Sequence, residues 1–103
     1  MSVPELDAEG YLIDPAAWSE AWAKETAARL GLELNEDHWS AIRFMRAFFE
    51  EHLVPPDARF VMRHLTEARG ADRNRLFELF PYGYPGQACK IAGMRRPRVW
   101  STG

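Results

Sequence analysis

Residues 35–53 read NEDHWSAIRFMRAFFEEHL, and this stretch decides the fold. Asn35 is a favoured residue for the start of a helix, and Glu36 and Asp37 follow where the positive end of a helix favours acids. Apolar residues then recur at spacings of three and four, at Trp39, Ile42, Met45, Phe49 and Leu53. Because a surface helix needs only one apolar stripe, so broad a face predicts a central helix covered by other elements.

The segment before this helix predicts a hairpin followed by one helix. Asp7-Ala8-Glu9-Gly10 is a turn signal between Leu6 and the apolar residues 11–13, so we expect a short β-hairpin over residues 1–13. Asp14 followed by Pro15 is typical of an N-cap and a first helical position. The helix that begins there is expected to end at Gly31.

The segment after the central helix predicts three shorter helices and an arm. Pro55-Pro56 ends the central helix, and Asp57 begins a helix that ends at Gly70. A short helix is expected over residues 73–80 and another over 87–92, separated by a loop at 81–86 (PYGYPG) that no helix should cross. Residues 94–103 show no periodicity. We therefore expect one domain over residues 1–103 with a mainly α (α+β) fold: an N-terminal β-hairpin (1–13), a helical body (14–93) with about five helices, and an irregular C-terminal arm (94–103).

Composition limits the class of protein. The chain has 103 residues, of which 47% are hydrophobic and 27% charged, as in one ordinary globular domain. Its single cysteine excludes an intramolecular disulfide and an all-cysteine zinc site, and it suits a reducing compartment. No apolar run approaches the roughly 20 residues that cross a bilayer, and the start of the chain lacks the pattern of a signal peptide. We expect a cytoplasmic protein, a monomer, with no membrane contact.

The charges divide along the chain. Residues 1–57 carry twelve acidic and four basic residues, a net charge of −8, whereas residues 58–103 carry nine basic and three acidic residues, a net charge of +6. One interpretation is that the two halves attract each other and solvate the surface. The other is a basic C-terminal face that binds an acidic protein or a nucleic acid.

Cys89 is the candidate nucleophile. It lies near the start of the expected helix over 87–92, where free N–H groups and the nearby Lys90, Arg95 and Arg96 would favour a thiolate. A lone cysteine also serves as a small buried apolar residue, so both interpretations stay open. His38, His52 and His64 are too far apart for two ligands on one helical turn, and there is no phosphate-binding glycine loop. We expect no metal, no cofactor and no self-sufficient active site.

The expected helices over 57–70 and 73–80 suggest a second kind of function. They carry five arginines around a short turn, which is typical of a helix-turn-helix that binds DNA. The arginines are Arg59, Arg63, Arg69, Arg73 and Arg75. Against this interpretation, the whole chain has a net charge of −2, and surface arginines often pair with nearby acids.

Two segments near the C-terminus carry a family resemblance. Leu79-Phe80-Pro81-Tyr82-Gly83, followed by Gly86-Gln87-Ala88-Cys89-Lys90-Ile91-Ala92-Gly93-Met94, resembles the signature of the DsrC/TusE sulfur-relay family, which includes the gamma subunit of dissimilatory sulfite reductase. The resemblance extends over residues 6–97. It implies a compact helical domain with a small β element at the N-terminus.

The resemblance also implies a role in carrying sulfur. DsrC proteins use two cysteines near the C-terminus, and TusE proteins, which act in tRNA thiolation, keep the one on the terminal arm. Cys89 matches the upstream cysteine, whereas Trp100 stands where the cysteine of the arm would be. We therefore expect Cys89 to be a candidate persulfide carrier, and Lys90, Arg95, Arg96, Arg98 and Trp100 to bind partners.

The resulting prediction is a sulfur-relay protein, either an accessory protein or a single-cysteine persulfide carrier rather than a self-sufficient enzyme. Its expected partners are sulfur-relay or sulfite-reductase-type proteins. The alternative is a regulatory homologue that transfers no sulfur and binds relay partners, or binds DNA through its basic helix-turn-helix-like region.

Overall fold

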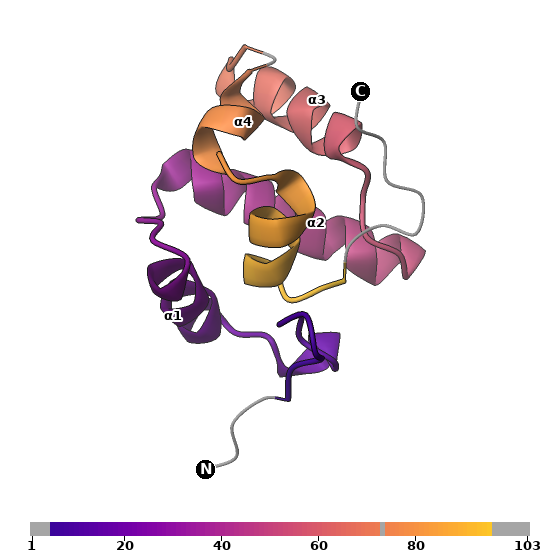
Figure 1. Ribbon diagram of the computed structural model, residues 1–103. Coiled ribbons are helices and arrows are strands. Elements are labelled where there is room, and N and C mark those ends of the chain that lie inside the picture. The colour runs from indigo at the N-terminus through magenta and orange to yellow at the C-terminus, as the bar shows by residue number, and fades with distance from the viewer. Residues whose placement is uncertain (1–4, 73, 96–103) are drawn as a thin grey trace.

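The long helix α2 lies at the centre of the molecule. The computed structural model describes residues 5–72 and 74–95, with the side chain of Pro85 left out. Within these residues the α-helices are α1 (Glu20–Arg29), α2 (Glu36–His52), α3 (Ala58–Arg69) and α4 (Arg75–Leu79). A 3-10 helix, η1 (Pro15–Ala17), precedes them, and a π-helix, η2 (Tyr84–Cys89), follows. α1 and α3 lie on opposite sides of α2, and the segment from α4 through η2 crosses between them (Figure 1).

The prediction of a central helix is confirmed. The side-chain oxygen of Asn35 accepts hydrogen bonds from the backbone N–H groups of Asp37 and His38, and the His38 ring accepts one from the backbone of Asn35. These reciprocal bonds satisfy N–H groups that every helix start leaves unpaired. Further along, Ile42 and Met45 are fully buried. The helix therefore begins where its capping residues predict and carries the middle of the core.

The predicted N-terminal β-hairpin is wrong. Residues 5–13 turn back on themselves, but the described part of the chain contains no strand, only an isolated antiparallel bridge between Leu6 and Leu12. The side chain of Asp7 holds the turn by accepting from the backbone N–H groups of Glu9 and Tyr11. A single bridge is too short to form a ladder, so this part is a packed turn and the fold is helical.

The predicted helix over residues 14–31 is in fact two helices. Asp14 and Pro15 do begin a helix, but it is the single turn η1, which ends when Trp18 adopts an extended backbone conformation. Ser19 then starts α1 by accepting a hydrogen bond from the backbone N–H of Trp22. Because serine is a strong N-cap residue, the chain can restart a helix at this point in a new direction.

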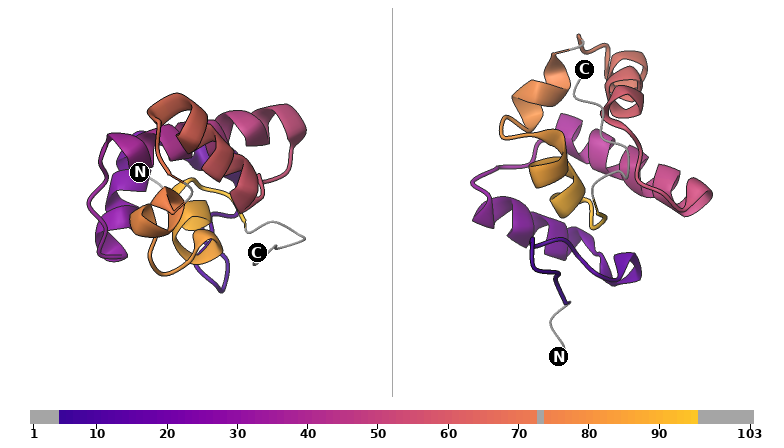
Figure 2. Two further views of the ribbon diagram at one scale, coloured as in Figure 1. Left: turned by 90° about the horizontal axis from the view of Figure 1, so that it is seen from above. Right: turned by 45° about the vertical axis from the view of Figure 1, so that its right-hand side comes forward.

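The loop predicted over residues 81–86 is shorter than expected, because a helix begins within it. η2 begins at Tyr84 and has its proline, Pro85, in the first turn, where the missing N–H of proline costs nothing. Gly83 provides the positive φ of 112° that turns the chain into η2. In the two turned views, η2 again lies against α2, and the N-terminal turn lies close to the C-terminal end of η2 (Figure 2). This arrangement places the cysteine-bearing segment in the middle of the molecule.

Candidate functional site

Cys89, the candidate nucleophile, is the last residue of η2 and has no exposed surface. The prediction that it lies at the start of a helix is therefore wrong, and free helix N–H groups do not reach it. It belongs to the same buried apolar cluster as residues of several elements, including Val61 and Leu65 of α3. The thiol is thus covered by protein on all sides in this conformation.

Tyr84 is the polar neighbour of the thiol. Its hydroxyl donates a hydrogen bond of 2.7 Å to the backbone oxygen of Pro56 and is also hydrogen-bonded to Cys89. Burial raises the pKa of Cys89 to about 12, although the hydrogen bond between Cys89 and Tyr84 acts in the opposite direction. Burial also raises the pKa of Tyr84. Cys89 is therefore a neutral thiol at physiological pH, and the expected lowering of its pKa does not occur.

Two side chains hold the segment that follows Cys89. The indole Nε1 of Trp18 donates a hydrogen bond of 2.9 Å to the backbone oxygen of Ile91. The guanidinium of Arg46 donates to the backbone oxygens of Ala92 (3.1 Å) and Pro15 (3.0 Å), and it lies 4.8 Å from the centroid of the Trp18 ring. We call Trp18 and Arg46 the clamp, because together they join η1, α2 and the end of the C-terminal helical segment.

Gly93 leaves the space that the Trp18 ring of the clamp occupies. Its φ of +75° is one that residues with side chains rarely adopt. In addition, a Cβ placed on Gly93 would meet the ring carbon Cδ1 of Trp18 at 2.5 Å, which is closer than real Cβ atoms come. The resemblance includes this glycine in its signature, and the structure gives it a physical role.

The basic residues expected to bind partners lie near the N-terminal turn where the structure describes them. The amino group of Lys90 is 5.3 Å from the centroid of the Tyr11 ring. Nε of Arg95 is 3.9 Å from a carboxylate oxygen of Asp7, and the Arg95 side chain is 64% exposed. Neither cation touches the buried thiol in any contact given by the structure. Arg96, Arg98 and Trp100 lie outside the described residues.

The arginines of the helix-turn-helix interpretation are largely engaged with acids. Asp37, at the start of α2, accepts from Nε of Arg69 at 2.7 Å and from Nε of Arg75 at 2.8 Å. Arg59 pairs with Asp57 at 3.5 Å. Arg73 lies outside the described residues. Since phosphate binding needs cations that are not already paired, the DNA-binding alternative is not favoured.

The sequence did not single out Tyr84, Trp18 or Arg46 as parts of the site. Trp18 and Ile91 are 73 positions apart, and no local pattern reports a contact over that distance. The only available signal is the wide apolar face of α2, which requires other segments to cover it. No cluster of three or more His, Cys, Asp or Glu side chains able to hold a metal ion occurs within residues 5–72 and 74–95. No helix in these ranges is long and apolar enough to cross a membrane.

The sequence matches a known family over nearly its whole length. The model of the family described as DsrC like protein matches residues 2–99. A protein named sulfurtransferase TusE from Pectobacterium atrosepticum is 40% identical over 94 residues, covering 88% of this chain and 86% of the relative. The protein of the same name from Sodalis glossinidius is 43% identical, covering 88% of this chain and 87% of the relative.

Solved structures share the fold. The oxidized gamma subunit of dissimilatory sulfite reductase (DsrC) from Archaeoglobus fulgidus superposes with a TM-score of 0.82 at 30% identity, covering 95% of this chain and 92% of that one. The NMR structure of DsrC from Allochromatium vinosum gives 0.81 at 34% identity, covering 95% and 90%.

Proposed function

This chain belongs to the family of DsrC-like proteins, and on that premise we propose that it works in a sulfur relay as an accessory protein, with Cys89 as its candidate persulfide carrier. The proposed partners are sulfur-relay or sulfite-reductase-type proteins. This follows the names of the relatives, sulfurtransferase TusE, and of the structural neighbours, which are DsrC gamma subunits. The single thiol supports an expected place in the cytoplasm.

The burial of Cys89 is the observation that supports an accessory role. To accept sulfur, the Cys89 thiolate would attack the outer sulfur of a donor persulfide, form a persulfide on Cys89, and release the donor as a thiol. That step needs a deprotonated and accessible sulfur atom. Cys89 has no exposed surface and a pKa raised to about 12, so loading requires η2 to open first. We therefore propose that the partners carry out the regular transfer of sulfur, and that this chain accepts sulfur on Cys89 only when η2 has opened.

Mass spectrometry after exposure to a low-molecular-weight persulfide donor tests this assignment. The folded chain should gain the mass of one sulfur atom far more slowly than the chain in denaturing urea. Cys89→Ser should gain none in either condition. Equal rates for folded and unfolded chains would show a freely accessible carrier and overturn the accessory role. A persulfide-loaded sulfurtransferase, added as the donor in place of the small molecule, should restore loading of the folded chain if docking opens η2.

Partner binding is assigned to the residues around and beyond the end of the helical body. We propose that residues 1–103 act as one domain whose arm, residues 94–103, contacts the partner. Lys90, Arg95, Arg96, Arg98 and Trp100 would provide the contact, since cations and a tryptophan are typical anchors of interfaces. Trp100→Ala should weaken capture of a purified sulfurtransferase partner without lowering the melting temperature. A large drop in melting temperature would instead make Trp100 a structural residue.

A further inference from the structure

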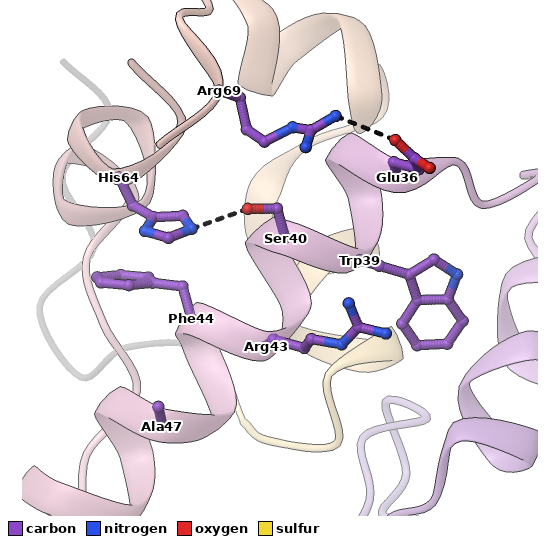
Figure 3. Close-up of a pocket in the computed structure, with 8 residues that line it drawn as sticks. All are labelled: Glu36, Trp39, Ser40, Arg43, Phe44, Ala47, His64 and Arg69. Atoms are coloured by element: carbon purple, nitrogen blue, oxygen red, sulfur yellow. Dashed lines mark hydrogen bonds and ion pairs between the residues drawn. The ribbon is translucent and has the colours of Figure 1, made fainter. Parts of the chain in front are cut away.

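A groove of about 740 Å³ lies on the face formed by α2 and α3, and the function proposed above does not use it. Its lining comes from these two helices alone, so no residue of η2 or of the clamp takes part. Figure 3 shows the side chains of Trp39, Arg43 and Phe44 along α2, with His64 and Arg69 across from them on α3. The groove is therefore separate from the cysteine-bearing segment.

One wall of the groove is aromatic and firmly held. The ring of His64 stacks on Phe44 with centroids 4.6 Å apart and an angle of 19° between the planes. Nε2 of the same imidazole is 2.9 Å from the hydroxyl oxygen of Ser40, a hydrogen bond that ties α3 to α2 (Figure 3). Since two contacts fix the ring, the wall is formed before any ligand arrives, which lowers the cost of binding.

The aromatic surface continues past the groove. Phe48 lies 6.1 Å from Phe44 and 5.4 Å from Phe60, measured between ring centroids. Phe60 is 45% exposed. Partly exposed rings that follow one another along two helices form an apolar strip of the kind that marks an interaction surface.

One charged group of the groove, the guanidinium of Arg43, is available to an acidic ligand. Its lining residues include two guanidiniums, of Arg43 and Arg69, against the one carboxylate of Glu36. Glu36 and Asp37 already bind Arg69. The Arg43 side chain is 67% exposed, and its contact with Glu20 is long, at 3.9 Å.

Arg43 is also the cation placed beside an aromatic ring. Its guanidinium carbon lies 5.7 Å from the centroid of the Trp39 ring. An exposed ion pair of this length contributes little, so a better-placed carboxylate can replace Glu20. A guanidinium can form two parallel hydrogen bonds with such a carboxylate.

We propose that this groove binds an acidic peptide segment of a partner protein, with an apolar side chain against Phe44 and His64 and a carboxylate on Arg43. Nucleic acid fits less well, because Arg69 is already paired with Glu36 and Asp37, and the one exposed guanidinium of Arg43 matches a single carboxylate rather than a row of phosphates. The proposal goes beyond the sulfur-relay function and does not depend on Cys89.

Titration of the ¹⁵N-labelled chain with a synthetic peptide that alternates glutamate and leucine tests this assignment. The indole signal of Trp39 and the amide signals of Ser40, Phe44 and His64 should shift together. The same peptide with lysine in place of glutamate should not shift them. Arg43→Gln should weaken binding about tenfold, as expected for the loss of a charge-assisted pair. The matched control, Arg29→Gln on α1, should bind like the unchanged chain.

A second variant guards against an effect of charge alone. Ala47 is exposed in the groove wall on α2, and Ala47→Gln keeps a good helix former while adding bulk and no charge. It should abolish the shifts without changing the melting temperature. The proposal would be overturned if the lysine peptide bound equally well, or if both groove variants kept the unchanged affinity. It would also be overturned if a single-stranded oligonucleotide bound more tightly, or if millimolar peptide caused no shifts. None of these results bears on sulfur loading at Cys89.

Discussion

The indole N–H of Trp18 donates a hydrogen bond to the backbone oxygen of Ile91, two residues beyond the buried cysteine. This bond joins the segment before α1 to the end of the C-terminal helical segment. The Arg46 guanidinium also lies over the Trp18 ring, and the ring packs against the backbone of Gly93. Three parts of the chain therefore depend on one side chain, which makes it the natural place to perturb the site without touching the thiol.

Trp18→Phe should destabilise the fold and uncover Cys89. The substitution keeps an aromatic ring but leaves the Ile91 oxygen without its indole partner, which should lower the free energy of unfolding by about 1–3 kcal/mol. Urea unfolding measures the loss, and the rate at which a thiol reagent labels Cys89 in the folded chain should rise. Trp39→Phe, on the far groove, is the control that should leave the labelling rate unchanged. Unchanged labelling in Trp18→Phe would mean that the clamp does not restrain η2.

Gly93→Ala should cost more stability than Gly31→Ala. Both glycines have a left-handed backbone, with φ of +75° and +77°, so alanine pays the same conformational penalty of about 1 kcal/mol at each. Only at Gly93 does the new Cβ collide with Trp18, because nothing lies within 4 Å of the Cβ position at Gly31. Thermal unfolding of the two variants separates the collision from the backbone term. Equal melting temperatures would show that Trp18 moves aside freely.

Stability should fall as the pH is lowered from 7 to 5, because of His38. This ring accepts from the Asn35 N–H at Nδ1 and lies 2.8 Å from the Leu79 oxygen at Nε2, so it is neutral with the proton on Nε2. Burial is the main cause that lowers the pKa of His38. Below about pH 6.5 the unfolded chain binds a proton that the folded chain resists, so the free energy of unfolding decreases with falling pH, by at most about 1.4 kcal/mol per unit.

Urea unfolding across this pH range measures the slope. His38→Gln should flatten the slope between pH 7 and 5, whereas His52→Gln, at the exposed end of α2, should not. A slope that survives in His38→Gln would assign the pH dependence to other groups.

Asp37→Asn should destabilise the fold more than Glu36→Gln. Hydrogen bonds from Arg69 and then Arg75 hold the pKa of Asp37 below its usual value. The stabilisation is therefore complete above about pH 3.8 and is lost as the pH falls through the lower folded pKa. Glu36 is 89% exposed and contacts only Arg69 among these arginines, at 3.3 Å, so its neutral replacement should be nearly silent at pH 7. Similar losses for the two variants, measured by urea unfolding at pH 7, would contradict the central place of Asp37.

Capping and spacing made the helices over 36–52 and 58–69 predictable. Their start and stop signals, Asn35, Asp57 and Gly70, act through bonds between residues only a few positions apart. The prediction of a hairpin is wrong because a turn signal such as Asp7 determines how the chain reverses but not whether paired β-strands follow. The π-helix was missed because a proline and two glycines at 83–86 predict a loop unless the surrounding core favours a helix.

The sequence singles out Cys89 as a candidate, but it does not predict the surroundings of the thiol. Residue chemistry and the family resemblance both pointed to Cys89. Its environment, however, depends on Tyr84 and on the Pro56 oxygen, 28 positions away from that tyrosine, and such contacts exist only once the chain has packed. The same reasoning applies to the charge division, because pairs such as Asp37 with Arg69 join an acid of the first half to a base of the second only in the folded chain.

The π-helical turn at Tyr84–Cys89 makes the length of this segment as important as its composition. A π-helix takes up about one residue more per turn than an α-helix. Because the extra residue is taken up within the turn, removal of one residue between Gly83 and Cys89 would let the segment tighten into an α-helical turn with the later side chains kept in their directions. Cys89 would then stay in the core, and the backbone of Ile91 would keep its hydrogen bond from Trp18. A further insertion has no such turn to absorb it, so we expect this segment to tolerate the loss of one residue better than the gain of one, and the number of residues between the glycine and the cysteine is itself a structural property of the protein.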